Sequence, residues 1–353
     1  MRRRLMEENV KRRIRAGLIL AFIAVVIGLL VWSRIQAYSL APTYKPLELR
    51  AYSPWLIPLV YLYDYFSHAW ICLLFAFSMA GLIYELVPKE TLTKHMGSSK
   101  VTGYTLALGI APFLTVCSCT MVPLFAGILY AGAGIGPAIT FLLMAPASNF
   151  LAILLTGELI SWEVAGARII ASIMVALTAG IIISKTPWGR QIEKEYRMSS
   201  ASPASAVEAV KPPLDERLMA ALKFAGYLAK QILPYFIAGL IAVSYLEAYL
   251  PEEIIRGYLT GVGGILLASA LGGPLYTPTL VEIVLGRGIW VREGTILSKG
   301  ALLSWLMGQP YDFANALAVS RITRWKVVAS YVIIAWAGSV IFGLLYGILS
   351  GSL

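Results

Sequence analysis

The sequence predicts an all-α polytopic membrane protein made of two inverted-topology repeats, with broken or re-entrant helical hairpins at the midplane and one extra N-terminal helix. Three observations lead to this fold class. First, 58% of the 353 residues are hydrophobic and only 14% are charged, and the hydrophobic residues lie in blocks of about 20, the length that crosses a bilayer. Second, the two halves share landmarks in the same order. Third, prolines and glycines interrupt the apolar stretch 111–149, as expected where non-helical backbone lines a cavity or is buried in protein.

The N-terminal segment predicts a retained first helix that starts in the cytoplasm. Residues 2–15 carry seven basic and two acidic side chains, and basic flanks stay on the cytoplasmic side. The apolar run 17–32 lacks a small-residue cleavage site after it, which favours a transmembrane helix over a cleaved signal peptide. We therefore expect a multi-pass protein of the cell membrane. The net charge of +10 clusters at the ends of hydrophobic segments, which indicates contact with the lipid bilayer and no nucleic-acid partner.

The chain divides into four predicted regions. Residues 1–54 hold the cytoplasmic N-terminus, the first helix and an outer loop, and residues 55–184 form the first repeat. Residues 185–217 are rich in Ser, Ala, Pro and mixed charge, which is typical of a cytoplasmic linker. Residues 218–353 form the second, inverted repeat. Within the first repeat, 101–115 and 121–132 are each short for a full crossing, which predicts a hairpin of discontinuous helices.

The repeat itself is predicted from matched landmarks. GPAITFLLMAP, which ends at Pro146, matches GALLSWLMGQP, which ends at Pro310, and Trp162 matches Trp325. The spacing from Pro146 to Trp162 is 16 residues and that from Pro310 to Trp325 is 15. Each unit holds three expected crossings and a hairpin. Because three is odd, we expect the second unit to lie upside down relative to the first.

Cys117 and Cys119 are one residue apart in the interrupted stretch. In a broken or extended segment alternate side chains share one face, whereas in a helix they point apart. The flanking Pro112 and Pro123 make the broken form plausible, in which two thiols are candidate ligands or exchange partners of a soft, thiophilic species. The alternative is that both are small residues that let helices pack closely. No His or further Cys lies nearby, so we expect neither a closed metal site nor a cofactor.

Polar residues beside the expected breaks complete the candidate site. Asn149 follows Pro146, and Asp312 follows Pro310. We expect both to face a solute, with a helix N-terminus that favours an anion, and the alternative is that they only cap broken backbone; for Ser148 we expect capping. The counterpart of the cysteine segment in the second half has hydroxyl groups and no cysteine. The predicted substrate-binding residues are Cys117, Ser118, Cys119, Thr120, Asn149, Tyr276, Thr277, Thr279, Glu282, Gln309, Asp312 and Asn315.

Charged residues inside the apolar segments are rare. A carboxylate at the centre of a membrane helix usually marks a cavity or an ion path, so Glu282 and Asp312 are the expected coupling groups. The alternative for Glu282 is an ion pair with Arg287 or Lys299 near the outer surface. Other basic residues of the apolar segments are expected to snorkel to the interfaces; they are Arg168, Lys223 and Lys230.

These motifs resemble the family of predicted permeases that includes the organoarsenical efflux permeases. The resemblance rests on CSCTMVPLFAGILYAGAGIGPAITFLLMAPASN, and on GGPLYTPTLVE and GALLSWLMGQP in the second half. It extends from about residue 69 to the C-terminus. It implies a membrane permease with inverted halves and with cysteines at the transport site. It does not assign a cargo, because some members are associated with organoarsenicals and others with no solute.

We therefore expect a secondary transporter and not an enzyme. Its solute would be small and thiophilic or oxyanion-like, such as an arsenical, a metalloid or a sulfur species, moved by alternating access. The chain has no GxxxxGK[ST] motif, which argues against nucleotide hydrolysis. The alternative is a membrane thiol-disulfide or sulfur-transfer protein with a soluble redox partner on the cytoplasmic side, although a CxxC motif is absent. A structural or assembly protein would leave the paired helix breaks unexplained. A second copy of the chain is a further candidate partner.

Overall fold

The computed structural model describes residues 2–40, 49–114, 118–200, 213–249, 260–275, 279–292 and 295–353. These residues are almost entirely helical. Six segments in this part of the chain are long and apolar enough to cross a membrane: Ile19–Ser39, Ile57–Leu86, Ile135–Leu159, Trp162–Lys185, Leu214–Tyr249 and Trp325–Leu349. The prediction of an all-α polytopic membrane protein is confirmed.

The first half of the chain folds into long helices that alternate with short ones. The helices are α1 (Arg2–Leu40), the short 3-10 helix η2 (Leu49–Ala51), α2 (Ile57–Leu86), α3 (Lys89–His95), α4 (Val101–Leu114), α5 (Ser118–Tyr130), α6 (Ile135–Ala147), α7 (Phe150–Leu159), α8 (Trp162–Lys185) and α9 (Pro187–Ser200). The expected crossing 135–155 is broken, because α6 ends at Ala147 and α7 starts after Asn149. Helix α9 occupies the first part of the region predicted as a linker.

The second half has helices in a similar order. They are α10 (Leu214–Tyr249), α12 (Gly261–Gly272), α13 (Thr279–Trp290), α14 (Lys299–Leu306), the 3-10 turn η4 (Gln309–Tyr311), α15 (Phe313–Ile322) and α16 (Trp325–Leu349). A small antiparallel ribbon of β1 (Val291–Arg292) and β2 (Thr295–Ile296) follows α13. Pro310 lies in η4, between α14 and α15, so this half also has a break where a long helix would otherwise continue.

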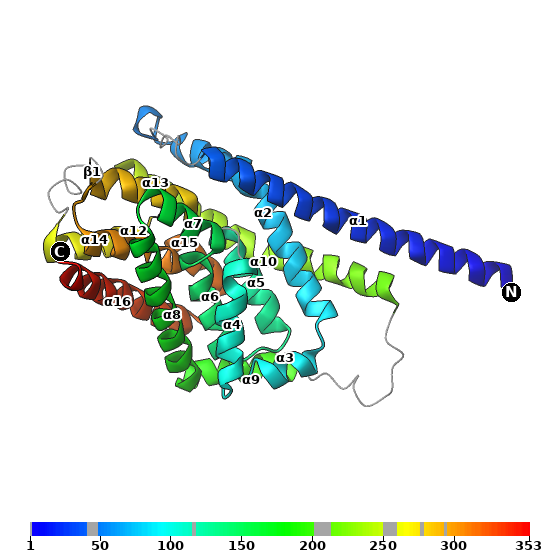
Figure 1. Cartoon of the computed structure of the whole chain (residues 1–353). Helices are drawn as coiled ribbons and strands as arrows, with labels where there is room; N and C mark the ends of the chain where they lie inside the picture. The colour runs from blue at the N-terminus through cyan, green and yellow to red at the C-terminus, as the bar shows by residue number, and fades with distance from the viewer. Residues whose placement is uncertain are drawn as a thin grey trace.

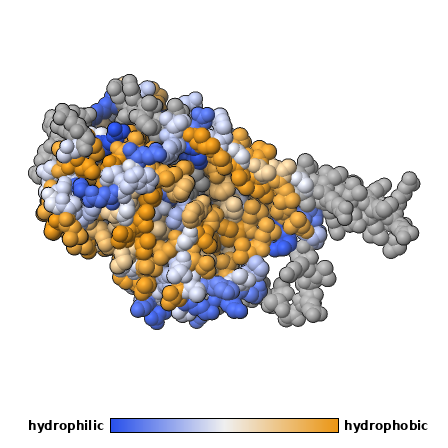
Figure 2. Space-filling view, in the orientation of Figure 1, coloured by the Kyte–Doolittle hydropathy of each residue, from blue (hydrophilic) through white to orange (hydrophobic). Residues whose placement is uncertain are grey.

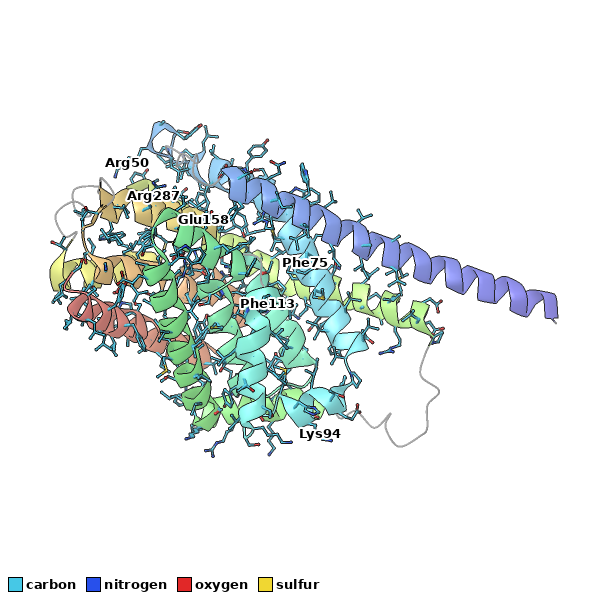
Figure 3. The ribbon with its side chains drawn as sticks, viewed as in Figure 1. Arg50, Phe75, Lys94, Phe113, Glu158 and Arg287 are labelled. Atoms are coloured by element: carbon cyan, nitrogen blue, oxygen red, sulfur yellow. The ribbon has the colours of Figure 1, made fainter. Side chains whose placement is uncertain are left out.

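The helices form one bundle with α1 along its side (Figure 1), where α1 contacts α2 and α10. On the face shown in Figure 2, hydrophobic residues cover much of the middle of the bundle, and hydrophilic residues gather at the end where α3 and α9 lie. Figure 3 shows Lys94 at this end, Glu158 and Arg287 toward the opposite end, and Phe113 between them. Phe113 is 76% exposed. An apolar surface between two polar ends is the pattern that a lipid bilayer requires of a protein that spans it.

Two long helices of the first half each pack against a long helix of the second half: α2 against α10, and α8 against α16. Both pairs are antiparallel. At one end of the α2–α10 pair, Arg217 donates a hydrogen bond to the backbone oxygen of Glu85 (2.7 Å). At the other end, the Tyr245 hydroxyl donates to the backbone oxygen of Pro54 (3.2 Å). Arg217 lies near the start of α10 and Glu85 near the end of α2, so the two helices run in opposite directions.

Helices α8 and α16 are also antiparallel. The Tyr346 hydroxyl, near the end of α16, donates to Glu163 at the start of α8 (3.0 Å). Arg324, which precedes α16, is paired at 2.6 Å with Glu195 of α9, the helix that follows α8. Each pair therefore joins a long helix of one half to the long helix in the corresponding place of the other half, running in the opposite direction.

Candidate functional site

Four short helices begin inside the protein rather than at its surface. The first residues or caps of α5, α7, α13 and α15 are Ser118, Asn149, Thr279 and Asp312, and each is at most 3% exposed. Helix α5 contacts α15, and α13 contacts α7; α13, α7 and α15 lie in the upper part of the bundle in Figure 1. The first backbone N–H groups of a helix have no partner within the helix, so the centre of this protein must satisfy several such donors.

Side chains from the opposite half satisfy part of this need. The Ser118 backbone N–H, at the start of α5, donates to Thr279 Oγ1 at the start of α13 (3.2 Å). The Thr279 hydroxyl donates in turn to Gln309 Oε1 (3.0 Å). Asn315 Nδ2 reaches the Ser118 backbone oxygen at 3.5 Å. Ser118 lies in the first half, whereas Thr279, Gln309 and Asn315 lie in the second, so these hydrogen bonds join the breaks of the two halves.

Asn149 and Asp312 cap the helices that follow the two breaks. Asn149 Oδ1 accepts a hydrogen bond from the Ala152 backbone N–H (2.9 Å), and Asp312 Oδ1 accepts one from the Asn315 N–H (2.7 Å). Both contacts are N-caps, which stabilise a helix by about 1 kcal/mol. The expectation that Ser148 caps the first break is wrong: its hydroxyl is buried and has no hydrogen-bond partner among the described residues. Asn149 takes this role because it is the residue directly before α7.

A fully buried ion pair lies next to these breaks. Arg168 Nη2 is 3.1 Å from Glu282 Oε2, and the two side chains are 0% and 1% exposed. Arg168 Nε also donates to the Ala147 backbone oxygen at the end of α6 (2.6 Å), and Nη1 donates to Thr156 Oγ1 on α7 (3.2 Å). The guanidinium therefore holds both sides of the α6–α7 break and binds α13 of the other half.

This pair corrects two expectations. Arg168 does not snorkel, because its guanidinium is buried among three partners. Glu282 pairs with neither of the partners expected near the outer surface: Lys299 pairs with Glu163 (2.8 Å), and Arg287 is exposed. Glu282 faces inward from the first turn of α13, where Arg168 supplies the opposite charge. An inward carboxylate needs such a partner because an unpaired charge is costly to bury.

Helical periodicity is the signal that could have found Arg168. The buried residues of α8 recur every three or four positions, and they include Ala165, Arg168, Ala171, Ser172 and Val175. Residues at this spacing share one face of a helix. Arg168 lies in the middle of that face, although its residue type suggested the membrane interface.

Several predicted site residues lie outside the described part of the structure: Cys117, Tyr276, Thr277 and the side chain of Cys119. Their sequence neighbours Ser118, Thr120 and Thr279 are buried. Thr120 is 0% exposed and lies in the first turn of α5. Among the residues that the structure describes, no group of three His, Cys, Asp or Glu side chains is arranged to hold a metal ion.

Discontinuous helices that meet around buried polar groups in a multi-pass bundle are typical of membrane transport proteins. The model of the family described as "Predicted permease" (ArsP_1) matches residues 60–348. This range is most of the chain, and the protein therefore belongs to that family of membrane permeases. The resemblance found from the sequence motifs is confirmed.

Two relatives show how far this similarity extends. UPF0718 protein MJ0584 of Methanocaldococcus jannaschii is 26% identical over 336 residues, which cover 79% of this chain and 92% of the relative. UPF0718 protein YraQ of Escherichia coli K12 is 26% identical over 139 residues, or 39% of this chain and 40% of the relative. No solved structure matches the chain.

Proposed function

We propose that this permease is a secondary transporter that moves a small solute by alternating access of two inverted repeats. The observation that carries the proposal is the hydrogen-bonded contact between the breaks of the two halves. Ser118 of α5 meets Thr279 of α13 and Asn315 of α15 inside the protein. In secondary transporters, solute sites lie at the interface of two repeats and are formed by discontinuous helices.

The inverted repeat is supported by matched contacts. Thr140 of α6 donates to the Ala176 backbone oxygen of α8 (3.2 Å), and Ser304 of α14 donates to the Ser339 oxygen of α16 (2.8 Å). Thr140 and Ser304 occupy the same place in the GPAITFLLMAP and GALLSWLMGQP segments, and Ala176 and Ser339 both lie 14 residues after the matched tryptophans. Together with the antiparallel α8 and α16, these contacts favour two copies of one unit in opposite orientations.

The proposed orientation can be measured at Trp162 and Trp325, which are matched in the repeat and are 61% and 69% exposed. Each is replaced by Cys in a chain whose three native cysteines are changed to Ala, and intact cells are treated with a membrane-impermeant maleimide. We expect Trp162→Cys to be labelled from outside. Trp325→Cys should be labelled only after the cells are permeabilised, because we place the N-terminus and the start of α16 in the cytoplasm. Labelling of both from the same side would contradict the inverted repeat.

The proposed solute is thiophilic. Cys117 and Cys119 flank Ser118, and the Ser118 backbone lies at the contact between the halves. Thiolates bind and exchange with soft elements, so an arsenical, another metalloid or a reduced sulfur species is the class of cargo that these residues suit. A helix N-terminus also favours negative charge, which keeps oxyanions such as thiosulfate among the candidates.

The test is uptake into vesicles that contain the purified protein. Arsenite, a methylated trivalent arsenical, arsenate and thiosulfate are offered in turn, and accumulation is compared with protein-free vesicles. We expect one of the thiophilic solutes to accumulate, and we expect the double variant Cys117→Ser with Cys119→Ser to lose that accumulation. The control is Cys72→Ala. Cys72 is buried in α2, outside the segment that carries Cys117 and Cys119, so its replacement should leave uptake unchanged.

Two outcomes would overturn this proposal. Full uptake by the double variant would remove the thiols from the transport site. No uptake of any solute, combined with cycling of Cys117 and Cys119 between thiol and disulfide in the presence of a soluble dithiol protein, would replace transport by thiol-disulfide exchange.

A further inference from the structure

The two oxygens of the Glu282 carboxyl group have different surroundings. Oε2 lies 3.1 Å from Arg168 Nη2. Oε1 is buried and has no hydrogen-bond partner within the described residues. A buried carboxylate oxygen without a donor is unfavourable, because its interaction with water is lost and not replaced. Oε1 is therefore a vacant acceptor inside the protein.

The charges around Glu282 do not balance. Among the described residues, the charged side chains that interact with Glu282 are Arg168 of α8 and Asp312 before α15, whose carboxylate repels that of Glu282. Tyr311 of η4 is a further titratable neighbour, and its hydroxyl is hydrogen-bonded to the Ser269 backbone oxygen and to Ser339 Oγ (2.9 Å each). One arginine against two carboxylates leaves one negative charge when all three are ionised. An uncompensated buried charge is costly, so this cluster favours the binding of one cation.

Asp312 is less suited than Glu282 to take up that cation. Its Oδ1 accepts from the Asn315 backbone N–H (2.7 Å), and its Oδ2 accepts from Asn315 Nδ2 (2.6 Å). Oδ1 makes the N-cap of α15 and Oδ2 is held by the Asn315 side chain, and donors to both oxygens favour the charged form. Glu282 has one vacant oxygen, and its backbone oxygen is held separately by Trp305 Nε1 (2.9 Å).

Arg168 is the counter-ion of Glu282, and its position is also held by two other hydrogen bonds. Its Nε and Nη1 groups bind the Ala147 oxygen and Thr156 Oγ1, both in the first half. Only Nη2 reaches across to the second half. If Glu282 became neutral, Arg168 would stay attached to the α6–α7 break, and only the ionic link between α8 and α13 would weaken.

We propose that Glu282 is the proton-binding group that couples transport to a proton gradient, with Arg168 as its counter-ion. A hydronium ion transfers a proton to Oε1: one O–H bond breaks in the hydronium ion, which leaves as water, and one O–H bond forms at Oε1. The carboxylate becomes a carboxylic acid, and the charge of the cluster formed by Arg168, Glu282 and Asp312 changes from negative to neutral. The weakened link allows α13 to move relative to α8. The proposal rests on the proposed function, since it names the ion that would drive it.

The first experiment needs no solute. The pH of the purified full-length protein in detergent is varied, and infrared difference spectra report the carbonyl stretch of protonated carboxyl groups. We expect a titrating band in the wild type that is absent in Glu282→Gln and retained in Glu163→Gln, the matched control from the surface pair with Lys299. A band that survives in Glu282→Gln, or no titrating band in the wild type, would overturn the assignment. If Glu282→Gln does not fold, Glu282→Asp should shift the titration of the same band.

The second experiment measures coupling in vesicles, with the solute that accumulates in the uptake screen. Uptake is compared with and without an imposed pH gradient, so that each variant serves as its own reference. We expect the gradient to stimulate uptake by the wild type and by Glu163→Gln, and to have no effect on Glu282→Gln. Stimulation of Glu282→Gln would overturn proton binding at Glu282. Absence of uptake by the wild type would instead contradict the proposed function and leave the infrared result to decide the proton site.

Discussion

The two halves of the molecule have similar packing and different charges. In both, a hydroxyl from the helix before the break donates to the backbone of the last long helix: Thr140 to Ala176, and Ser304 to Ser339. In both, a glycine of that long helix, Gly180 or Gly343, leaves room for the hydroxyl-bearing side chain. The helix after each break is capped by its preceding residue, Asn149 or Asp312.

The charged residues do not follow this correspondence. Arg168 lies six residues after Trp162, and the matching position six residues after Trp325 is Tyr331; both side chains are 0% exposed. The first half thus supplies the buried cation and a neutral cap, whereas the second half supplies the carboxylates of Glu282 and Asp312. Contacts to the backbone are similar in both halves, whereas the buried ion pair takes Arg168 from the first half and Glu282 from the second. The buried charges are therefore distributed asymmetrically between two halves with similar packing.

The largest expected effect on stability comes from removing the buried arginine. Arg168→Met should lower the free energy of unfolding by about 3–5 kcal/mol, because it leaves Glu282 buried without its counter-ion. Tyr331→Phe at the matching position should cost less than about 1 kcal/mol, since the Tyr331 hydroxyl has no hydrogen-bond partner in the described structure. Denaturant unfolding in detergent measures both. The double variant Arg168→Met with Glu282→Met should recover much of the loss; equal losses for Arg168→Met and Tyr331→Phe would contradict the comparison.

A smaller effect tests the shared packing. Gly180→Ala would place a Cβ atom against Thr140 Oγ1, and Gly343→Ala would place one against Ser304 Oγ. Each should destabilise the protein by about 1–3 kcal/mol, the usual cost of overpacking, and the two losses should be similar. Thermal unfolding is the measurement. Gly166→Ala on α8 is the control, because no atom lies within 4 Å of its added Cβ, and alanine favours a helix. If only one of the two variants loses stability, the packing is not shared.

The smallest effect concerns the caps. Asn149→Ala and Asp312→Ala should each lower the free energy of unfolding by about 0.5–2 kcal/mol. The loss for Asp312→Ala should be the larger one, because Asp312 also accepts from Asn315 Nδ2. Ser148→Ala should be nearly neutral, since its hydroxyl has no partner among the described residues. Denaturant titration ranks the three variants, and a loss at Ser148 equal to that at Asn149 would show that the break is held differently.

Local patterns in the sequence predicted the elements of the site better than its contacts. Apolar blocks of membrane-spanning length predicted the long helices, and proline followed by Asn149 or Asp312 predicted the two breaks. The same patterns suggested the wrong partner for Glu282, because Lys299 is 17 residues away in the sequence and Arg168 is separated from it by 114. Arg168 was expected at the interface because arginine usually snorkels, although its position on the buried face of α8 indicated otherwise.

The sequence by itself determined the class of protein, the positions of the helix breaks and the membership of a permease family, because hydrophobic length, proline and short polar caps act over a few residues. Only the tertiary structure decided that Ser118 meets Thr279 and that Arg168 pairs with Glu282. These contacts join distant parts of the chain, and their partners are selected by the packing of α8 against α16 and of α7 against α13. The segment that carries Cys117 and Cys119 predicts a site, and the packing of the two halves brings Arg168 and Glu282 together.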